Sequence, residues 1–463
     1  MAESMKKSVE IILVLTMMGG ALAFGGVQSI TYSIMELVIF GLLFTVLAQQ
    51  THQGEIRLPL PAWPVLFAGL VVLQLMPLPV ALVGIISPHR VTDISLFPQT
   101  TWAALSIYPH DTLLNLVELL AYLGAFVLAA WATDYRKGRS VLVQGLILLG
   151  FFEAAYGIVQ YLTGWQKIFT YTKKYDLEEA TGTYINRNHF AGLLEMVLPF
   201  VLAAAFYSFQ VWASHRHGYE RGPESEERSS AAYQTFFYSF LLLIMFVAVI
   251  FSRSRMGILV TVFTVGLVAV LGQLRASRKA WLVGVGLFLA CALGYGLWIG
   301  LGPVLTRFEG VSDPTYLRME GRISIWQDTV RMVRDYPISG SGLGTFELGY
   351  RHYQTTLVSQ GVEHAHNDFL QTAAETGIPG TALLFLPIFV LLGKLVVSFL
   401  DDPRPYRRAM TLGCIGSILA LLLHSLTDFN LRLPANAMVF AVVLGLGYRV
   451  LMERRERQVR QFR

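Results

Sequence analysis

The chain has 463 residues, of which 54% are hydrophobic and only 14% are charged. A soluble protein of this size carries about a quarter charged residues, which cover a surface exposed to water. The composition therefore excludes an ordinary soluble protein and indicates one that is embedded in a membrane. The formal net charge of +5 is small, and we expect no nucleic-acid partner. Cys291 and Cys414 lie in apolar runs, so neither a disulfide framework nor a cysteine metal site is implied.

A helix needs about 20 mainly apolar residues to cross the hydrocarbon of a bilayer. Applied in chain order, this length predicts an all-α integral membrane fold with about 12 transmembrane helices. They cover residues 8–24, 30–48, 62–86, 112–132, 140–162, 188–212, 235–251, 256–274, 280–301, 379–399, 407–425 and 434–451. Pro77 and Pro79 interrupt the third segment. The first follows Lys6 and Lys7 and also resembles a cleavable signal peptide, whose removal would leave this topology unchanged.

Short loops rich in lysine and arginine stay in the cytoplasm, and this bias orients the chain with both termini inside. The loops expected inside contain Arg136, Lys137 and Arg139, then Arg275, Arg278 and Lys279, then Arg404, Arg407 and Arg408. Residues 1–301 are predicted to hold nine transmembrane helices and residues 379–451 three more. Between them, residues 302–378 form a large loop on the outer side, and residues 452–463 form a basic cytoplasmic tail.

The outer loop is itself expected to be helical. Apolar residues at helical spacing predict an amphipathic helix in residues 318–335. A second helix is expected in residues 346–359, and a third in residues 367–376, closed by the glycine that follows. The glycines in residues 339–344 resemble a phosphate-binding loop, but no strand precedes them, so we expect a turn.

Four polar groups are expected to lie together at the outer face of the membrane. They are Asn186-Arg187-Asn188-His189, Ser252-Arg253-Ser254-Arg255, Glu320-Gly321-Arg322 and His364-Ala365-His366-Asn367. Placing an arginine in a bilayer costs ~2.5–3.5 kcal/mol on insertion scales, and such an arginine is usually functional or paired. Its fork of donors suits a phosphate group. The alternative is an interface anchor for Arg187, Arg253 and Arg255, and a solvated helix-face charge for Arg322.

His366 is the candidate for acid–base chemistry, because an imidazole can take or give a proton near neutral pH. A structural role is the alternative. A metal site built from His364, His366 and Asp368 is a further alternative, although it needs one more ligand.

Several more ionisable residues lie in or beside the predicted membrane helices, where such side chains are functional candidates. The glutamates are Glu36, Glu118, Glu153 and Glu195. Pairing with the arginines is the simplest interpretation of these carboxylates. His424 and Asp428 stand four residues apart at the end of a predicted helix, and we expect them to brace each other or the site.

These residues resemble the bacterial O-antigen ligase and polymerase superfamily of integral membrane glycosyltransferases. The resemblance covers roughly residues 180–435, and its most specific element is a loop motif. This motif reads His366-Asn367, nine residues, Gly377, two residues, Gly380. Other segments that look like family signatures are Thr181-Gly182-Thr183-Tyr184-Ile185-Asn186-Arg187-Asn188, Ser254-Arg255, Gly321-Arg322 with Trp326, and His424 with Asp428-Phe429-Asn430.

The resemblance implies a GT-C-like fold and a glycan donor carried on a polyprenyl diphosphate, usually undecaprenyl diphosphate. It implies metal-independent transfer, with no cofactor, on the periplasmic side of the bacterial inner membrane, where the large loop would carry the catalytic histidine. His366 would be the general base, Arg255 and Arg322 would hold the diphosphate, and Arg187 would assist them. The residues expected to support the site are Asn186, Asn188, Arg253, His364, Asn367 and Asp428.

The family performs several reactions, which differ in the acceptor. The acceptor is lipid A-core in a ligase, another lipid-linked repeat unit in an O-antigen or exopolysaccharide polymerase, and a protein hydroxyl in an O-oligosaccharyltransferase. The intact histidine motif favours a ligase. A transporter or flippase of lipid-linked glycans is the alternative from another class. Transporters place binding residues near the bilayer midplane, whereas the polar groups of this chain are expected at the outer surface.

Overall fold

The computed structural model describes residues 2–54, 56–95, 99–134, 140–214, 223–273, 286, 322–355 and 361–461. These parts are almost entirely helical, which confirms the all-α integral membrane fold. Within them the strands form two short antiparallel pairs. They are β1 (Leu78–Pro79) with β2 (Trp102–Ala103), and β3 (Lys167–Ile168) with β4 (Tyr171–Thr172). The likeness to GT-C folds stays a prediction.

Nine helices in the described residues are long and apolar enough to cross a membrane. They are α2 (Ser29–His52), α6 (Pro109–Ala132), α7 (Val141–Thr163), α8 (Arg187–Ser214), α9 (Pro223–Phe251), α10 (Arg255–Gln273), α16 (Asp368–Asp401), α17 (Pro405–His424) and α18 (Pro434–Gln461). Helix α1 (Ala2–Leu22) covers the first predicted segment and carries charged residues near its start. The predicted helix in 280–301 lies outside the described residues, so a count of twelve stays a prediction.

The third predicted membrane segment, residues 62–86, is not one helix. Helix α3 (Ala62–Leu75) has 14 residues, about 21 Å of helix, which is too short to cross about 30 Å of hydrocarbon. The chain then turns through β1 into the short helices α4 (Val80–Ile86) and α5 (Pro88–Ile94). Pro77 and Pro79 explain the break, because proline has no backbone N–H to donate and its ring blocks a continuing helix.

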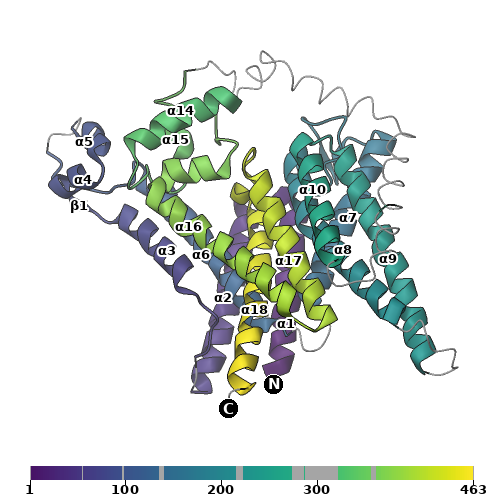
Figure 1. Ribbon diagram of the computed structural model, residues 1–463. Coiled ribbons are helices and arrows are strands. Elements are labelled where there is room, and N and C mark those ends of the chain that lie inside the picture. Colours follow the sequence, from purple (N-terminus) through teal and green to yellow (C-terminus); the bar gives the residue numbers. More distant parts are fainter. Residues whose placement is uncertain are drawn as a thin grey trace.

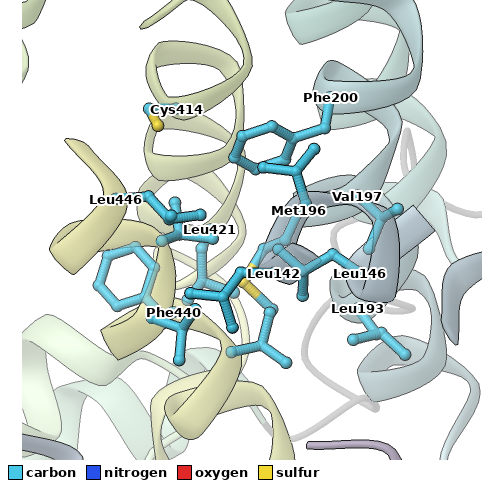
Figure 2. Close-up of a cluster of buried hydrophobic side chains, with 14 of the residues drawn as sticks. Leu142, Leu146, Leu193, Met196, Val197, Phe200, Cys414, Leu421, Phe440 and Leu446 are labelled. Carbon is cyan, nitrogen blue, oxygen red and sulfur yellow. The ribbon is translucent and has the colours of Figure 1, made fainter. Parts of the chain in front are cut away.

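Helix α8 forms the centre of the membrane core, and 94% of its most apolar 18-residue stretch is buried. Figure 2 shows its side chains Leu193, Met196, Val197 and Phe200 among residues of α7, α17 and α18; those labelled are Leu142, Leu146, Cys414, Leu421, Phe440 and Leu446. Glycines on α17 allow it to approach closely, since a Cβ on Gly413 would lie 2.4 Å from the Phe200 ring. Membrane helices often pack through small residues at such contacts. The hydrophobic effect does not drive their association in lipid, so close van der Waals contact has to stabilise it.

The chain ends lie opposite the outer-loop helices. Helix α1 begins and α18 ends at one end of the molecule, and α14 (Arg322–Asp335) and α15 (Phe346–Tyr350) lie at the other (Figure 1). Two short 3₁₀ turns, η1 (Phe24–Gly26) and η4 (Asn430–Arg432), lead into α2 and α18.

The helices of the outer loop differ in part from those expected. Helix α14 ends at Asp335 as predicted, and residues 318–321 lie outside the described chain. Helix α15 has five residues, and the chain turns after it, so the predicted helix in 346–359 is wrong in length. The third helix begins after Asn367, whose side chain accepts a hydrogen bond from Leu370 N–H. This helical segment ends at Gly377 as predicted, because that residue has a non-helical backbone with φ 71° and ψ 176°. A second segment of α16 follows the kink and runs to Asp401.

The glycine-rich segment in residues 339–344 forms a turn that packs against the membrane helices. Gly340 has φ 65°, and a Cβ there would lie 2.2 Å from the backbone of Glu375 in α16. The side chain of Gln74, at the end of α3, donates hydrogen bonds to the carbonyls of Ser339 (2.7 Å) and Glu375 (2.8 Å), and accepts one from Leu343 N–H (3.1 Å). One buried amide therefore ties α3, the turn and α16 together.

Candidate active site

The segment that precedes α16 lies along the loop that follows α17. The carbonyls of residues 425–427 accept, in that order, from the backbone N–H of Asp368, the side-chain amide of Asn367 and the guanidinium of Arg322, each at 2.9 Å. Buried backbone carbonyls must find donors, and here the donors come from the outer loop. These three bonds hold the histidine motif and Arg322 against the end of α17.

Asp428 is the carboxylate around which the expected site residues meet. Its Oδ1 lies 3.6 Å from His366 Nδ1 and 3.8 Å from His189 Nε2, and its Oδ2 lies 3.8 Å from Arg322 Nη2. Burial opposes ionisation of this carboxyl, but the facing imidazoles of His189 and His366 and the charge of Arg322 hold the pKa of Asp428 well below its usual range. The carboxylate is only 1% exposed, whereas His366 is 31% exposed. An anchored anion therefore faces an accessible imidazole.

Three imidazole rings, those of His189, His364 and His366, contact the ring of Phe429. His364 stacks on it with ring centroids 4.1 Å apart, and His189 and His366 meet it edge-on at 4.6 Å and 4.9 Å. Aromatic contacts of this kind fix ring orientation as well as burying apolar area. The sequence motif contained Phe429, but nothing in the sequence assigned it this position.

His366 is held in a backbone conformation that L-residues rarely adopt, with φ 49°. Its neighbours are fixed on both sides. The carbonyl of Ala365 accepts from Trp326 Nε1 at 2.9 Å, and its N–H donates to Gln371 Oε1 at 3.0 Å. Asn367 caps α16. Strain of this kind persists only where the surroundings impose it, and it is common at functional sites.

His364 differs from His366 in its surroundings. It lies mostly buried, with Nδ1 3.3 Å from Gln371 Nε2. Burial, together with the positive charge of Arg432, lowers the pKa of His364 to about 3. This imidazole is therefore neutral at physiological pH.

Arg187 and its two asparagines form the start of α8. The Arg187 Nη1 lies 2.7 Å from Glu179 Oε1 and 3.2 Å from Asp176 Oδ1. Asn186 accepts a hydrogen bond through Oδ1 from Asn188 N–H at 2.8 Å, which organises the first turn. The two carboxylate partners of Arg187 were not foreseen from the sequence, because they come from a loop with no recognisable motif.

The Ser-Arg-Ser-Arg turn caps α10. The hydroxyl of Ser254 accepts from Gly257 N–H at 3.2 Å, which makes Ser254 the N-cap and Arg255 the first residue of the helix. Arg253 has φ 52°; its Nη1 lies 3.0 Å from Glu178 Oε2, and its guanidinium lies over the Tyr161 ring. Arg253 is therefore paired within the protein, and its role stays a prediction.

The structure brings Arg322, His366 and Asp428 into one contact group and adds His189. Arg187 stands two residues before His189 on α8. Arg255 stands at the adjacent start of α10, where a Cβ on Gly257 would lie 2.7 Å from the Ala191 side chain of α8. The arginines therefore begin neighbouring helices at the end of the molecule that holds His366.

The carboxylates within the helices pair differently from the expectation. Glu195 accepts from His424 Nδ1 at 3.0 Å, and both side chains are buried. Glu153 accepts from the Thr183 hydroxyl at 2.6 Å. Pairing with arginines is therefore wrong for these two glutamates. His424 lies directly before the loop of Asp428, so its bond to Glu195 braces the end of α17 from below.

The alternative metal site is not supported by the position of Asp368. Its Oδ2 accepts from the Ser425 hydroxyl at 2.8 Å and from Leu431 N–H at 3.1 Å, so it fastens the loop after α17. Within the described chain no three His, Cys, Asp or Glu side chains are grouped as metal ligands. His364 and His366 contact the ring of Phe429 and do not point with Asp368 toward one shared metal position.

Part of the chain matches a known protein family. Residues 240–385 match the family described as O-antigen ligase, whose members are glycosyltransferase-type enzymes. No curated protein matches the sequence. The matched residues contain the Ser-Arg-Ser-Arg turn, α14 and the His366 motif, whereas His189 and Asp428 complete the same contact group from outside them. The chain is therefore a multi-pass membrane protein that contains a segment similar to the O-antigen ligase family.

Proposed function

We propose that the protein transfers a glycan from an undecaprenyl-diphosphate donor to an acceptor hydroxyl at the periplasmic face of the bacterial inner membrane. The observation that carries this proposal is the meeting of His366 and Arg322 at one buried carboxylate, Asp428. A base for the acceptor and a cation for the leaving group then stand within reach of one bound sugar.

In the proposed reaction His366 takes the proton of the acceptor hydroxyl. The acceptor oxygen bonds to the anomeric carbon of the donor sugar as the bond from that carbon to the diphosphate oxygen breaks. The diphosphate leaves with the electron pair. Asp428 faces Nδ1 of the His366 imidazole, and we propose that Nε2 takes the proton of the acceptor hydroxyl. A carboxylate that binds one ring nitrogen fixes the tautomer in which the other can act as a base.

The guanidinium groups act on the leaving group. Arg322 is 29% exposed and is held by Thr427 and Asp428. We propose that Arg322 and Arg255 face the diphosphate, because preorganised cations lower the barrier where negative charge develops. Arg187 already has two carboxylate partners, which favours an assisting role. Among the supporting residues, Asn186 and Asn188 shape the start of α8, Asn367 holds the motif, and the neutral His364 packs against Phe429.

A ligase that uses lipid A-core is the reaction we favour. A repeat-unit polymerase and a protein O-oligosaccharyltransferase share the proposed chemistry and differ in the acceptor. A transporter of lipid-linked glycans is disfavoured by the position of the site. The contact group lies where α8, α14, α16 and α17 begin or end, not along their middles.

The test is kinetic and uses the purified full-length protein with undecaprenyl-diphosphate glycan and lipid A-core. His366→Ala should lower kcat by ~10²–10⁴, the usual contribution of a general base, with donor affinity unchanged. His352→Ala is the matched control, because His352 is an exposed histidine on the same side of the molecule. Full activity of His366→Ala would remove the proposed base.

A further inference from the structure

The chain between α3 and α6 forms a hairpin at the end of the molecule that holds α14 and α15. This outer hairpin, residues 76–105, contains β1, α4, α5 and β2, and the structure describes all of it except 96–98. A hydrogen bond from Ser106 N–H to the carbonyl of Gln74, at 3.0 Å, closes its base. It has a small core of its own, made of Val83, Ile94 and Leu105.

The outer hairpin also exposes large apolar side chains outside this core. Ile85 is 76% exposed and Trp102 is 60% exposed, and Met76 and Leu82 are exposed as well. Leu82 and Ile85 stand three residues apart, so they share one side of α4, a helix whose seven residues include no charged side chain. Trp102 pairs in the sheet with Pro79, the N-cap of α4, and paired residues project from the same face. We call Met76, Leu82, Ile85 and Trp102 the hairpin face.

The charged residues of the outer hairpin lie on α5 and are bound within the protein. The Tyr336 hydroxyl donates to Asp93 Oδ2 at 3.1 Å, and Arg90 Nη1 lies 3.4 Å from the same oxygen. His89 Nδ1 lies 3.8 Å from Oδ2 of Asp335, the last residue of α14. Helix α5 therefore fastens the hairpin to the end of α14, whereas α4 stays apolar and exposed.

Both ends of the outer hairpin lie at the expected outer boundary of the membrane. At one end, the Gln74 side chain donates to the carbonyl of Glu375 at 2.8 Å, four residues before the predicted membrane segment 379–399. At the other end, α6 begins at Pro109, three residues before the predicted segment 112–132. Figure 1 shows α4 and α5 at the edge of the molecule, away from the two chain ends. The hairpin therefore lies at the level where hydrocarbon meets water.

The hairpin face continues an apolar surface of α3. One side of α3 packs against α6 and α16, whereas Leu66 and Leu73 are exposed, as expected of a helix that borders lipid. Met76 is the C-cap of α3 and follows Leu73 by three residues, so the exposed apolar residues pass from α3 into the hairpin. A tryptophan is typical of this level, because tryptophan is enriched at both membrane–water interfaces.

We propose that the hairpin face inserts into the outer leaflet of the membrane, among the acyl chains of its phospholipids. Elements that lie in the interface bury an apolar face about 5–10 Å deep. Through α5, the inserted hairpin holds the end of α14 at a fixed height above the membrane. The inference concerns contact with lipid and does not depend on the proposed reaction, so either can fail without the other.

The test places single nitroxide spin labels on the full-length protein in a Cys291→Ser/Cys414→Ser background, reconstituted in phosphatidylcholine vesicles. Oxygen concentrates in hydrocarbon and a nickel chelate stays in water, so their collision rates with a label report its surroundings. The label at Ile85→Cys should favour oxygen severalfold, as should a label at Leu66→Cys on α3. His352→Cys, exposed after α15, is the water-facing control and should favour the nickel chelate. If the label at position 85 behaves as the label at 352 does, the inference is overturned.

A second copy of the chain, or another protein, is the competing occupant of the hairpin face. A protein interface would shield the label at position 85 from both reagents, and two copies in contact would broaden each other's spectra. Either result would overturn the inference, whereas free collision with oxygen supports it.

A charge on the hairpin face tests the same contact in a second way. With the label at Leu82→Cys, the added substitution Ile85→Asp should lower the preference for oxygen severalfold, because a carboxylate is costly in hydrocarbon. Leu348→Asp is the matched control, since Leu348 is exposed on α15, and it should leave the preference unaltered. If Ile85→Asp also leaves it unaltered, Ile85 does not hold the hairpin in the leaflet and the inference is wrong. The label at Ile85→Cys decides the question even if Ile85→Asp prevents folding.

Discussion

At the scale of single residues, Asp428 decides the arrangement of the site. It faces two imidazoles and one guanidinium while almost fully buried. A buried charge is costly unless partners compensate it, and here the partners include His366 and Arg322, the groups that the proposed reaction uses. The burial of Asp428 costs free energy. The same carboxylate thus holds His366 and Arg322 near each other.

His364 gives a prediction about stability and pH. Its pKa is about 3 in the folded protein, compared with ~6.5 for a free imidazole. Between these values the unfolded chain binds a proton that the folded protein excludes, so the free energy of unfolding falls as the pH drops from ~6.5 toward 3. His364→Gln removes this titration. Between pH 7.5 and pH 4.5, the Tm of this variant should fall by about 2–4 °C less than the Tm of the unaltered protein.

Thermal unfolding in detergent at several pH values measures this difference. The control is His352→Gln, the same substitution at an exposed histidine outside the contact group of Asp428. If Tm depends on pH in the same way for His364→Gln and the unaltered protein, the pKa of His364 is not lowered by folding and the prediction is wrong.

The site was predicted in part, and the limit is physical. His366, Arg322 and Asp428 were identified because the residues flanking each form a recognisable local motif. Their mutual contacts, and the position of Phe429, depend on how α14, α16 and α17 pack. Packing between distant segments leaves no local signal in one sequence. The carboxylate partners of Arg187 were missed for the same reason.

At the scale of elements, the membrane helices in the described residues have at least one end within a few residues of the prediction, although α9 begins at Pro223 instead of 235 and α18 ends at Gln461 instead of 451. A backbone in lipid must satisfy its hydrogen bonds internally, so a long apolar run can only be a helix. The main error falls where this constraint weakens, because α3 stops before Pro77 and the third predicted segment is too long. The predicted break at Gly377 is present as a kink in α16. Pro379 lies in the first turn of the segment after this kink, where proline is tolerated because no N–H donor is needed.

The glycine-rich turn carries a prediction of its own. Gly340→Ala should destabilise the protein twice over, through its positive φ and through a Cβ 2.2 Å from the backbone of Glu375. Gly164→Ala is the matched control, because Gly164 also has a positive φ, 68°, but has open space around it. We expect the control to lose about 1–2 kcal/mol and Gly340→Ala to lose a further ~1–3 kcal/mol from overpacking.

Tm values of the two variants, with transfer rates at a temperature where both are folded, test this difference. Gly340→Ala should also lower activity, because the turn sets α14 against α16. Equal Tm values would show that the turn can move away from α16 without cost, and would remove its role in positioning the site.

At the scale of the whole molecule, two ends have separate tasks. One end holds the start of α1 and the end of α18, and the other holds α14, α15 and the histidine motif (Figure 1). The arginines Arg187, Arg255 and Arg322 begin α8, α10 and α14, and Arg322 lies against Asp428 beside the histidine motif.

This division leads to a prediction of membrane orientation. The basic loops favour the cytoplasm for the end with the termini, so the motif should face the periplasm. In a Cys291→Ser/Cys414→Ser background, His352→Cys should react with a membrane-impermeant maleimide in intact spheroplasts. Gln53→Cys, exposed after the end of α2, should react only after permeabilisation. The reverse pattern would place His366 beside cytoplasmic nucleotide sugars, and a donor carried on a lipid diphosphate would no longer be required.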